Sequence, residues 1–130
     1  MTQLSRSAAT LVAEAKSRIQ NLTPSEVAAE LAAGTAVLVD LREPAELARE
    51  GRIAGAVHVP RGLLEFAADP ASPGHHPGLD PARRAILHCA GGGRSALGAA
   101  TLLSMGYRSV AHLDGGFAAW KANALPVITG

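Results

Sequence analysis

A lone cysteine beside a run of glycines is the feature of this chain with the clearest chemical potential. Cys89 is the only cysteine, and it follows the apolar run AIL and a histidine. Glycines allow backbone N–H groups to turn inward without steric cost, and a loop that enters a helix leaves several N–H groups unpaired. Such a loop would form a small anion-binding cup around the sulfur and favour the thiolate, and an arginine would add a donor fork. The residues expected to form this cup are Ala90, Gly91, Gly92, Gly93, Arg94 and Ser95.

Other interpretations of the same loop have to be compared with this one. A buried, inert cysteine followed by a tight turn is the common role of a free cysteine. Gly91, Gly93 and Ala96 match the dinucleotide fingerprint G-x-G-x-x-A, but residues 97–130 are too few for a second nucleotide-binding half. A cysteine phosphatase signature has one more residue between its cysteine and arginine than this chain has. A cup that is one residue shorter suits a sulfur atom better than a phosphate.

The remaining pattern predicts the elements that position the loop. Apolar, β-branched runs predict strands, and amphipathic spacing with capping signals predicts helices. The alternation predicts an α/β domain with a mostly parallel sheet, and the proline-rich segment 67–83 is expected to be a loop. The predicted strands are 36–41, 56–60, 85–89 and 109–114, and the predicted helices are 5–19, 24–33, 44–50, 95–105 and 117–123.

Three further side chains follow strand ends and are candidates for the same site. Ligands of open parallel sheets bind beyond the carboxyl ends of the strands, where Cys89 is expected to lie. Asp40 ends a strand at this edge and either orients the loop or stabilises a turn with Arg42. Arg61 follows a strand end and either contacts an anionic donor or is a solvated surface arginine.

Composition narrows the function classes and the compartment. The net charge is +1, charged residues make up 18% of the chain and aromatic residues 3%, which disfavours nucleic-acid and membrane-surface binding. A single cysteine permits no internal disulfide and is typical of a reducing compartment. The first twenty residues contain Glu14, Lys16 and Arg18 and have no continuous apolar stretch, so a cytoplasmic location is expected.

Four motifs, in order along residues 20–128, resemble the rhodanese-like sulfurtransferase family. They are VLVDLREPAE, GRIAGAVHVP, CAGGGRSA and LDGGFAAWKANALPV. The third fits the C-x-x-G-x-R-S form of the family's active loop. Arg52, Ala54 and Phe117 depart from the residues that are usual in the family, but none of them lies in this loop.

The resemblance implies a rhodanese-like fold with a central five-stranded, mostly parallel sheet flanked by helices. It implies that Cys89 takes sulfane sulfur from thiosulfate or a similar donor, holds it as a persulfide and passes it to a thiol or to cyanide. From the residues themselves, Arg94 and the loop amides are expected to bind the donor, with Arg61 as a candidate further contact and Asp40 and Arg42 as candidate supports of the site. No metal or cofactor is expected. A slow or non-catalytic module that binds or senses sulfur is the alternative.

The resemblance also suggests how the chain is divided. Residues 20–130 would form the rhodanese-like domain, and residues 1–19 would form an N-terminal helical extension that the resemblance does not cover. This helix is expected to cover an apolar face or to pair two chains as a homodimer.

Overall fold

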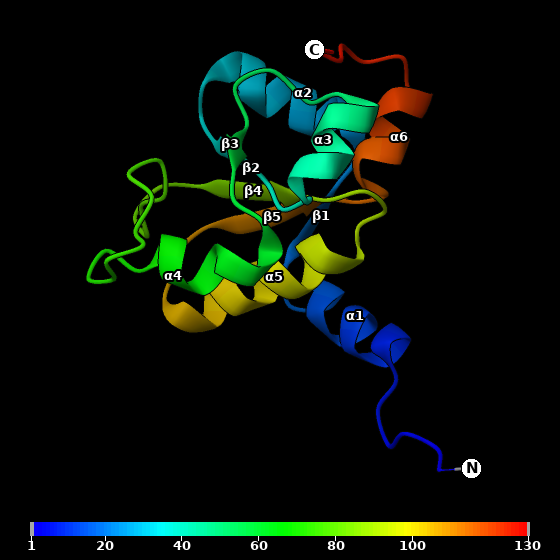
Figure 1. The fold of residues 1–130 in the computed structure, drawn as a ribbon, viewed down its shortest axis with the longest axis vertical. Coiled ribbons are helices and arrows are strands. Elements are labelled where there is room, and N and C mark those ends of the chain that lie inside the picture. The colour runs from blue at the N-terminus through cyan, green and yellow to red at the C-terminus, as the bar shows by residue number, and fades with distance from the viewer. Residues whose placement is uncertain (1, 130) are drawn as a thin grey trace.

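A five-stranded sheet forms the centre of the computed structural model, which describes residues 2–129 (Figure 1). The strand order is β1-β5-β4-β2-β3, and every pair of neighbours is parallel. The predicted fold class, an α/β domain with a five-stranded, mostly parallel sheet, is confirmed. The strands are β1 (Gln20–Leu22), β2 (Val37–Asp40), β3 (Val57–His58), β4 (Ala85–His88) and β5 (Val110–Leu113).

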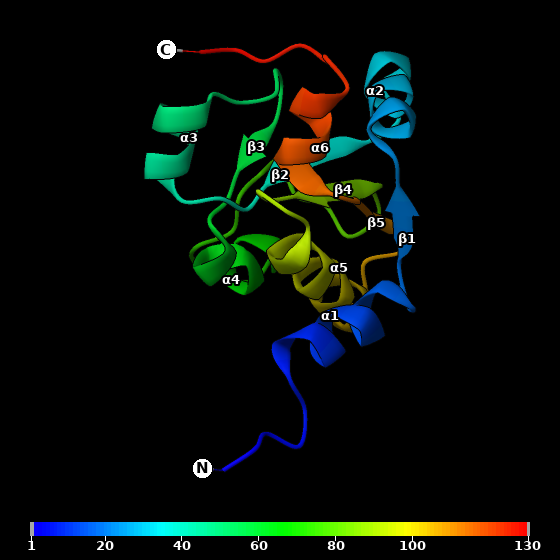
Figure 2. The same ribbon diagram turned by 90° about the vertical axis from the view of Figure 1, so that its right-hand side faces the viewer.

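Helices cover both faces of the sheet (Figure 2). In that view α1, α4 and α5 lie on one side, and α2, α3 and α6 lie on the other. Because both faces are covered, the central strands β4 and β5 are buried along their full length, as parallel strands usually are. The helices are α1 (Ala8–Lys16), α2 (Pro24–Ala33), α3 (Pro44–Glu50), α4 (Leu64–Ala68), α5 (Gly93–Met105) and α6 (Gly116–Ala122), and a single 3₁₀ turn, η1 (Arg61–Leu63), precedes α4.

Local capping signals place α2 where the sequence predicts it. Thr23 is the N-cap and accepts a hydrogen bond from the N–H of Glu26, while the Glu26 side chain accepts one from the N–H of Thr23. Pro24 is the first helical residue, and Gly34 ends the helix in the left-handed conformation at φ 70°. These contacts all lie within a few residues of each other, which is why the sequence alone locates this helix.

Three elements differ from the sequence-based expectation. Strand β1 was not predicted, because its three residues carry no apolar run and its hydrogen bonds come from β5. The predicted loop 67–83 begins too early, since α4 continues through Ala68 and buries Ala67 and Ala68 in the core. The helix predicted over 5–19 is shorter, and only its residues 8–16 are helical.

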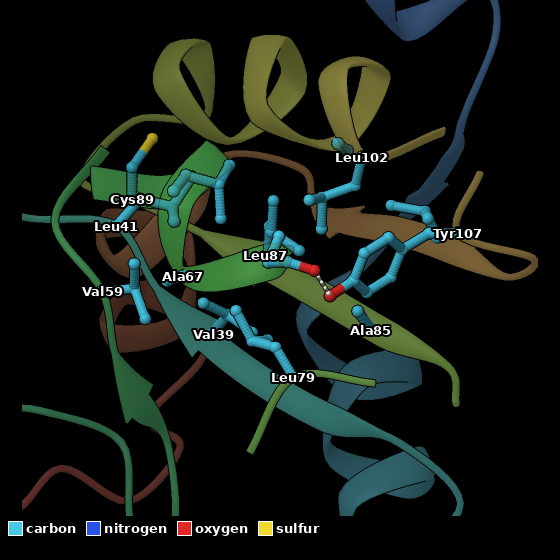
Figure 3. Close-up of a cluster of buried hydrophobic side chains, with 14 residues drawn as sticks. Val39, Leu41, Val59, Ala67, Leu79, Ala85, Leu87, Cys89, Leu102 and Tyr107 are labelled. Atoms are coloured by element: carbon cyan, nitrogen blue, oxygen red, sulfur yellow. Dashed lines mark hydrogen bonds between the residues drawn. The ribbon is translucent and has the colours of Figure 1, made fainter. Parts of the chain in front are cut away.

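The core lies in two clusters, one on each face of the sheet. The cluster drawn in Figure 3 packs Leu41 and Leu87 against Leu102 of α5, and Cys89 belongs to it. Helix α5 comes very close to the sheet at Gly98, where an added Cβ would lie 2.8 Å from Leu41 and 3.2 Å from Leu87. This close approach packs the middle of α5 against Leu87, near the end of β4.

Helix α1 packs against α5 of its own chain. Ala15 is buried, and Val12 lies beside Gly93 at the start of α5. The helix is also joined to the region after β5, because Lys16 Nζ lies 2.9 Å from Asp114 Oδ1. The pairing of two chains through this helix stays a prediction. Within residues 2–129, no helix has the length and apolar character needed to cross a bilayer.

Candidate active site

Cys89 follows the carboxyl end of β4, and the four residues after Ala85–His88 form a tight loop into α5. Its sulfur accepts hydrogen bonds from the backbone N–H groups of Gly92, at 3.2 Å, and Ser95, at 3.4 Å. Gly92 has φ 106° and precedes the first turn of α5, so a glycine is needed at this position for the loop to close. Two backbone donors and the positive end of the α5 dipole therefore face the sulfur.

The start of α6 holds the loop from the opposite side. The N–H of Phe117 donates to the carbonyl of Cys89 at 2.8 Å, and the N–H of Ala118 donates to that of Ala90 at 3.1 Å. These contacts direct the loop carbonyls toward α6. Gly116 makes this approach possible, because a Cβ at this residue would lie 2.5 Å from the carbonyl oxygen of Ala90.

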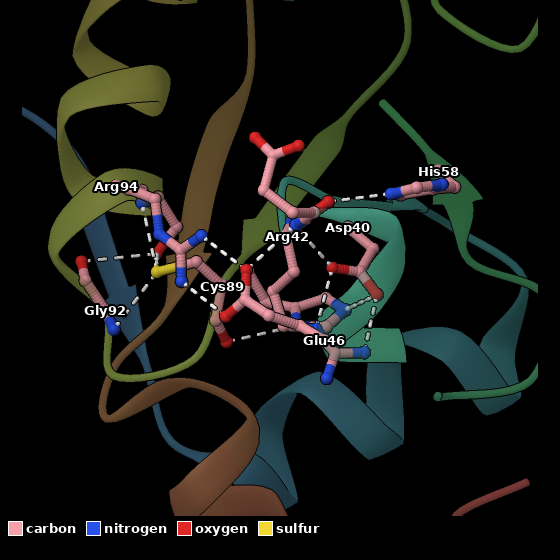
Figure 4. A network of polar contacts seen from close by, with 10 residues as sticks. Asp40, Arg42, Glu46, His58, Cys89, Gly92 and Arg94 are labelled. Carbon is pink, nitrogen blue, oxygen red and sulfur yellow. Dashed lines mark hydrogen bonds and ion pairs between the residues drawn. The ribbon is translucent and has the colours of Figure 1, made fainter. Parts of the chain in front are cut away.

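Arg94 forms a two-pronged ion pair with Glu46 of α3 (Figure 4). Its Nη1 lies 2.7 Å from Oε1, and its Nη2 lies 2.9 Å from Oε2. The hydrogen bonds from Arg94 lower the pKa of Glu46 to about 2. Conversely, the Glu46 carboxylate raises the pKa of Arg94, and the nearby Cys89 sulfur adds a smaller contribution in the same direction. Glu46 was not among the predicted site residues, because in the sequence it is simply an acidic residue in the first turn of the predicted helix 44–50.

Asp40 and Arg42 form a buried ion pair beside the loop. Both side chains are 1% exposed, and Arg42 reaches both Asp40 oxygens, at 3.0 and 2.8 Å. Burial raises the pKa of Asp40, but the hydrogen bonds from Arg42, its charge and the adjacent His88 together outweigh this effect, and the net shift is downward. Arg42 also donates to the carbonyl of Gly51 and lies 4.1 Å from the centre of the Phe117 ring. The pair therefore ties the end of β2 to the end of α3 and to α6.

Arg61 is held by its backbone beside the end of β2, since its N–H donates to the carbonyl of Leu41 at 3.0 Å. Its guanidinium pairs with Glu65 at 2.9 Å, one turn along the chain, and reaches Thr101 of α5 at 3.5 Å. The structure thus brings Asp40, Arg42 and Arg94 to the surroundings of the cysteine loop, while Arg61 is paired with an acidic neighbour on the α4 side.

A hollow of about 380 Å³ opens next to the loop. Its lining includes Ala90, the residue after the cysteine, together with Arg42, Glu46 and Phe117. Arg49 and Lys121 also line it, and both pair with Glu50, a further lining residue. Cys89 itself is only 1% exposed, so the sulfur is nearly covered in this conformation.

His88 precedes Cys89 and lies fully buried against the Asp40 carboxylate. Its Nε2 is 3.5 Å from Asp40 Oδ2 and has no hydrogen-bond partner within residues 2–129. Burial lowers the pKa of His88; the Asp40 charge opposes this shift, and the Arg42 charge adds to it. The net shift is downward, so His88 is neutral in the folded protein at neutral pH.

The buried His88 makes the stability of the protein depend on pH. An unfolded histidine takes up a proton near pH 6.5, whereas folded His88 resists it. Below that pH the unfolded state therefore binds more protons than the folded state. The free energy of unfolding should fall by up to about 1.4 kcal/mol for each unit by which the pH is lowered. His112 is also buried with a lowered pKa and adds to the slope. Urea titrations at several pH values between 7 and 5 measure how steeply the free energy of unfolding falls with pH. This pH dependence should be weaker for His88→Gln than for the unmodified chain, and an equal pH dependence would contradict this account.

Comparison with known proteins places this geometry in a family. Residues 23–123 match the Rhodanese-like domain family. A thiosulfate sulfurtransferase GlpE from Ectopseudomonas mendocina is 35% identical over 107 residues, covering 82% of this chain and 88% of that protein. An uncharacterized Synechocystis protein is 33% identical over 92 residues, and the match spans 71% of this chain but only 46% of that protein.

Among solved structures, one of a Rhodopseudomonas palustris protein of unknown function is similar over nearly the whole chain. It has a TM-score of 0.92 and 38% sequence identity, and the match covers 98% of both chains. That protein is described as a possible tyrosine phosphatase.

Proposed function

The chain belongs to the rhodanese-like family, and on this premise we propose that it is a sulfurtransferase that carries sulfane sulfur as a persulfide of Cys89. The observation that carries the proposal is the pair of backbone N–H groups, from Gly92 and Ser95, aimed at the sulfur. Donors arranged in advance around a position where negative charge resides stabilise that charge without reorganisation. They would stabilise first the thiolate and then the persulfide.

The reaction has two displacement steps. The Cys89 thiolate attacks the outer sulfur of thiosulfate, a sulfur–sulfur bond forms to Cys89, and sulfite leaves with the electron pair of the broken bond. An acceptor thiolate or cyanide then attacks the outer sulfur of the persulfide and releases the Cys89 thiolate. This is nucleophilic catalysis through a covalent intermediate.

Mass spectrometry of the intact protein tests the proposal. Incubation with thiosulfate should add the mass of one sulfur atom, and addition of cyanide should remove it with formation of thiocyanate. Cys89→Ser should show no such adduct. An adduct that forms equally on Cys89→Ser, or none on the unmodified chain, would contradict the proposal.

A slow or sulfur-sensing module is the second candidate, and the near-complete burial of Cys89 favours it. A donor reaches this sulfur only after a neighbouring side chain moves, which slows turnover. The two candidates differ in the second step, because a sensor would form the adduct but retain it in the presence of cyanide and of small thiols.

Phosphatase activity is the alternative that the Rhodopseudomonas protein's description raises. Four residues separate Cys89 from Arg94, one fewer than in the phosphatase signature. The shorter loop leaves less room for the oxygens of a phosphoryl group. We expect no hydrolysis of p-nitrophenyl phosphate above that of Cys89→Ser.

The Arg94–Glu46 pair predicts opposite effects for two substitutions. Arg94→Ala removes the guanidinium that would bind an anionic donor, and it should raise the donor KM and slow persulfide formation. Glu46→Gln removes a negative charge and releases Arg94, and it should lower the KM for thiosulfate several-fold. Steady-state kinetics over a range of thiosulfate concentrations measure both effects. Unchanged kinetics in both variants would exclude Arg94 from donor binding.

A further inference from the structure

A line of polar side chains leads away from the Cys89 sulfur toward the edge strand β1. The sulfur lies 3.6 Å from Ser95 Oγ, which lies 2.9 Å from His112 Nδ1 on β5. His112 Nε2 lies 2.8 Å from Asn21 Oδ1 on β1. Ser95 and His112 are both fully buried. The contacts join the loop, the central strand β5 and the edge strand β1 into one series.

Asn21 determines which nitrogen of His112 carries the proton. Its Nδ2 donates to the carbonyl of Lys16 at 3.0 Å and to that of Ile19 at 3.3 Å. The amide oxygen must therefore face His112 and accept a hydrogen bond, so Nε2 carries the proton in neutral His112. This leaves Nδ1 with a free lone pair directed at Ser95.

The hydroxyl proton of Ser95 is consequently drawn toward His112. The other acceptor in reach is the carbonyl of Gly92, but its distance of 3.2 Å is longer than the 2.9 Å to His112 Nδ1, and it also accepts a hydrogen bond from Ala96 N–H. With its proton on the His112 side, the Ser95 oxygen presents a lone pair to the cysteine. The thiol can then donate its proton to Ser95 Oγ.

We propose that His112, acting through Ser95, is the internal proton acceptor for the Cys89 thiol. The S–H bond breaks, its electron pair stays on sulfur, and its proton moves to Ser95 Oγ. The original hydroxyl proton of Ser95 moves to His112 Nδ1. The product is a thiolate that accepts from Ser95 O–H and an imidazolium whose two N–H groups donate to Ser95 and Asn21, so every group keeps a partner.

The charges around this series favour a coupled transfer. Burial lowers the pKa of His112, Asp114 opposes this shift and Lys16 adds to it, while Asp114 and Lys16 pair with each other at 2.9 Å. An isolated imidazolium is thus disfavoured at this position. The thiolate formed in the same event supplies the compensating negative charge, and Arg94 is the cation beside that sulfur.

This inference rests on the proposed function only in that the thiolate is the nucleophile, and it can be tested without any sulfur donor. The pH dependence of the thiolate's ultraviolet absorbance and of iodoacetamide alkylation reports thiol ionisation directly. His112→Gln can still accept from Ser95 and donate to Asn21, but it cannot hold the proton. Ser95→Ala interrupts the series, although it retains the backbone N–H that faces the sulfur.

Both variants should lower the alkylation rate at pH 7 at least about tenfold, corresponding to about 1.4 kcal/mol, and shift the profile to higher pH. The double variant should be no slower than Ser95→Ala alone, because the two residues act in series. Ser104→Ala, an exposed serine on the same helix, and His75→Gln serve as matched controls and should leave the profile unchanged. A His112→Gln profile that coincides with that of the unmodified chain would overturn the proposal.

The unmodified protein provides a second test that does not depend on the folding of a variant. Because the transfer moves a proton within the protein, the ¹⁵N NMR signals of labelled His112 should show the doubly protonated form throughout the pH range in which thiolate absorbance first appears. A His112 that stays neutral while the thiolate forms would overturn the proposal. If the protein passes this test but takes no sulfur from thiosulfate, the proton transfer from Cys89 through Ser95 to His112 stands and the proposed sulfurtransferase function is contradicted.

Discussion

Replacing Gly116 with alanine should both destabilise the fold and disable the cysteine loop. Gly116 has φ 65°, where an L residue costs about 1–2 kcal/mol. Its new Cβ would lie 2.5 Å from the carbonyl oxygen of Ala90 and 2.8 Å from that of Cys89, and overpacking of this kind costs about 1–3 kcal/mol. We expect the free energy of unfolding to fall by about 2–5 kcal/mol in denaturant titrations.

The same substitution should slow the reaction of Cys89 with iodoacetamide, because the loop carbonyls must move away from α6 and the Gly92 and Ser95 amides move with them. Gly34→Ala is the matched control. Gly34 has φ 70°, but an added Cβ would have no atom within 4 Å. The free energy of unfolding of Gly34→Ala should fall by about 1–2 kcal/mol, from backbone strain alone, and its cysteine should react as in the unmodified chain. Equal losses in the two variants would show that the contact with the loop is unimportant.

Removing the Asp40 carboxylate should be the most destabilising change to a charged side chain near the site. Among residues 2–129, Asp40→Ala leaves the buried Arg42 guanidinium with the Gly51 carbonyl and the Phe117 ring as its remaining partners. Breaking a buried ion pair by removing one member costs about 3–5 kcal/mol, because an uncompensated charge stays in the interior. Thermal and denaturant unfolding should show this loss.

Two further variants test whether burial is the cause. Glu65→Gln breaks the partly exposed pair with Arg61 and should cost roughly 0–1 kcal/mol. Replacing both buried partners, as Asp40→Leu with Arg42→Met, should recover much of the stability, since no charge then remains in the core. A double variant as unstable as Asp40→Ala would contradict this explanation.

Much of the fold was predictable because its signals are local. The Thr23–Glu26 capping box and the left-handed Gly34 set the limits of α2, and the apolar run before Cys89 corresponds to β4. Strand β1 escaped prediction because its pairing residue is remote, with Asn21 opposite His112. Three residues without an apolar pattern become a strand only when β5 supplies their hydrogen bonds.

The candidate site likewise has a part that local sequence predicts and a part that depends on distant segments. The cysteine, the glycines after it and the helix that follows are consecutive, so the sequence predicts a loop with inward amides, and the structure directs two of these amides at the sulfur. The partners of that loop come from distant segments. Glu46 pairs with Arg94 from a separate helix, and Arg61, for which donor binding and surface solvation were both open, is paired with Glu65.

The α/β alternation and the identity of the reactive loop could therefore be predicted, since both depend on residues that are neighbours along the chain. Tertiary structure alone decided how deeply Cys89 is buried, which carboxylate holds Arg94 and which histidine stands behind Ser95. These features depend on how closely the helices approach the sheet and on the order of its strands. Such distances are set by packing between segments that the sequence keeps far apart.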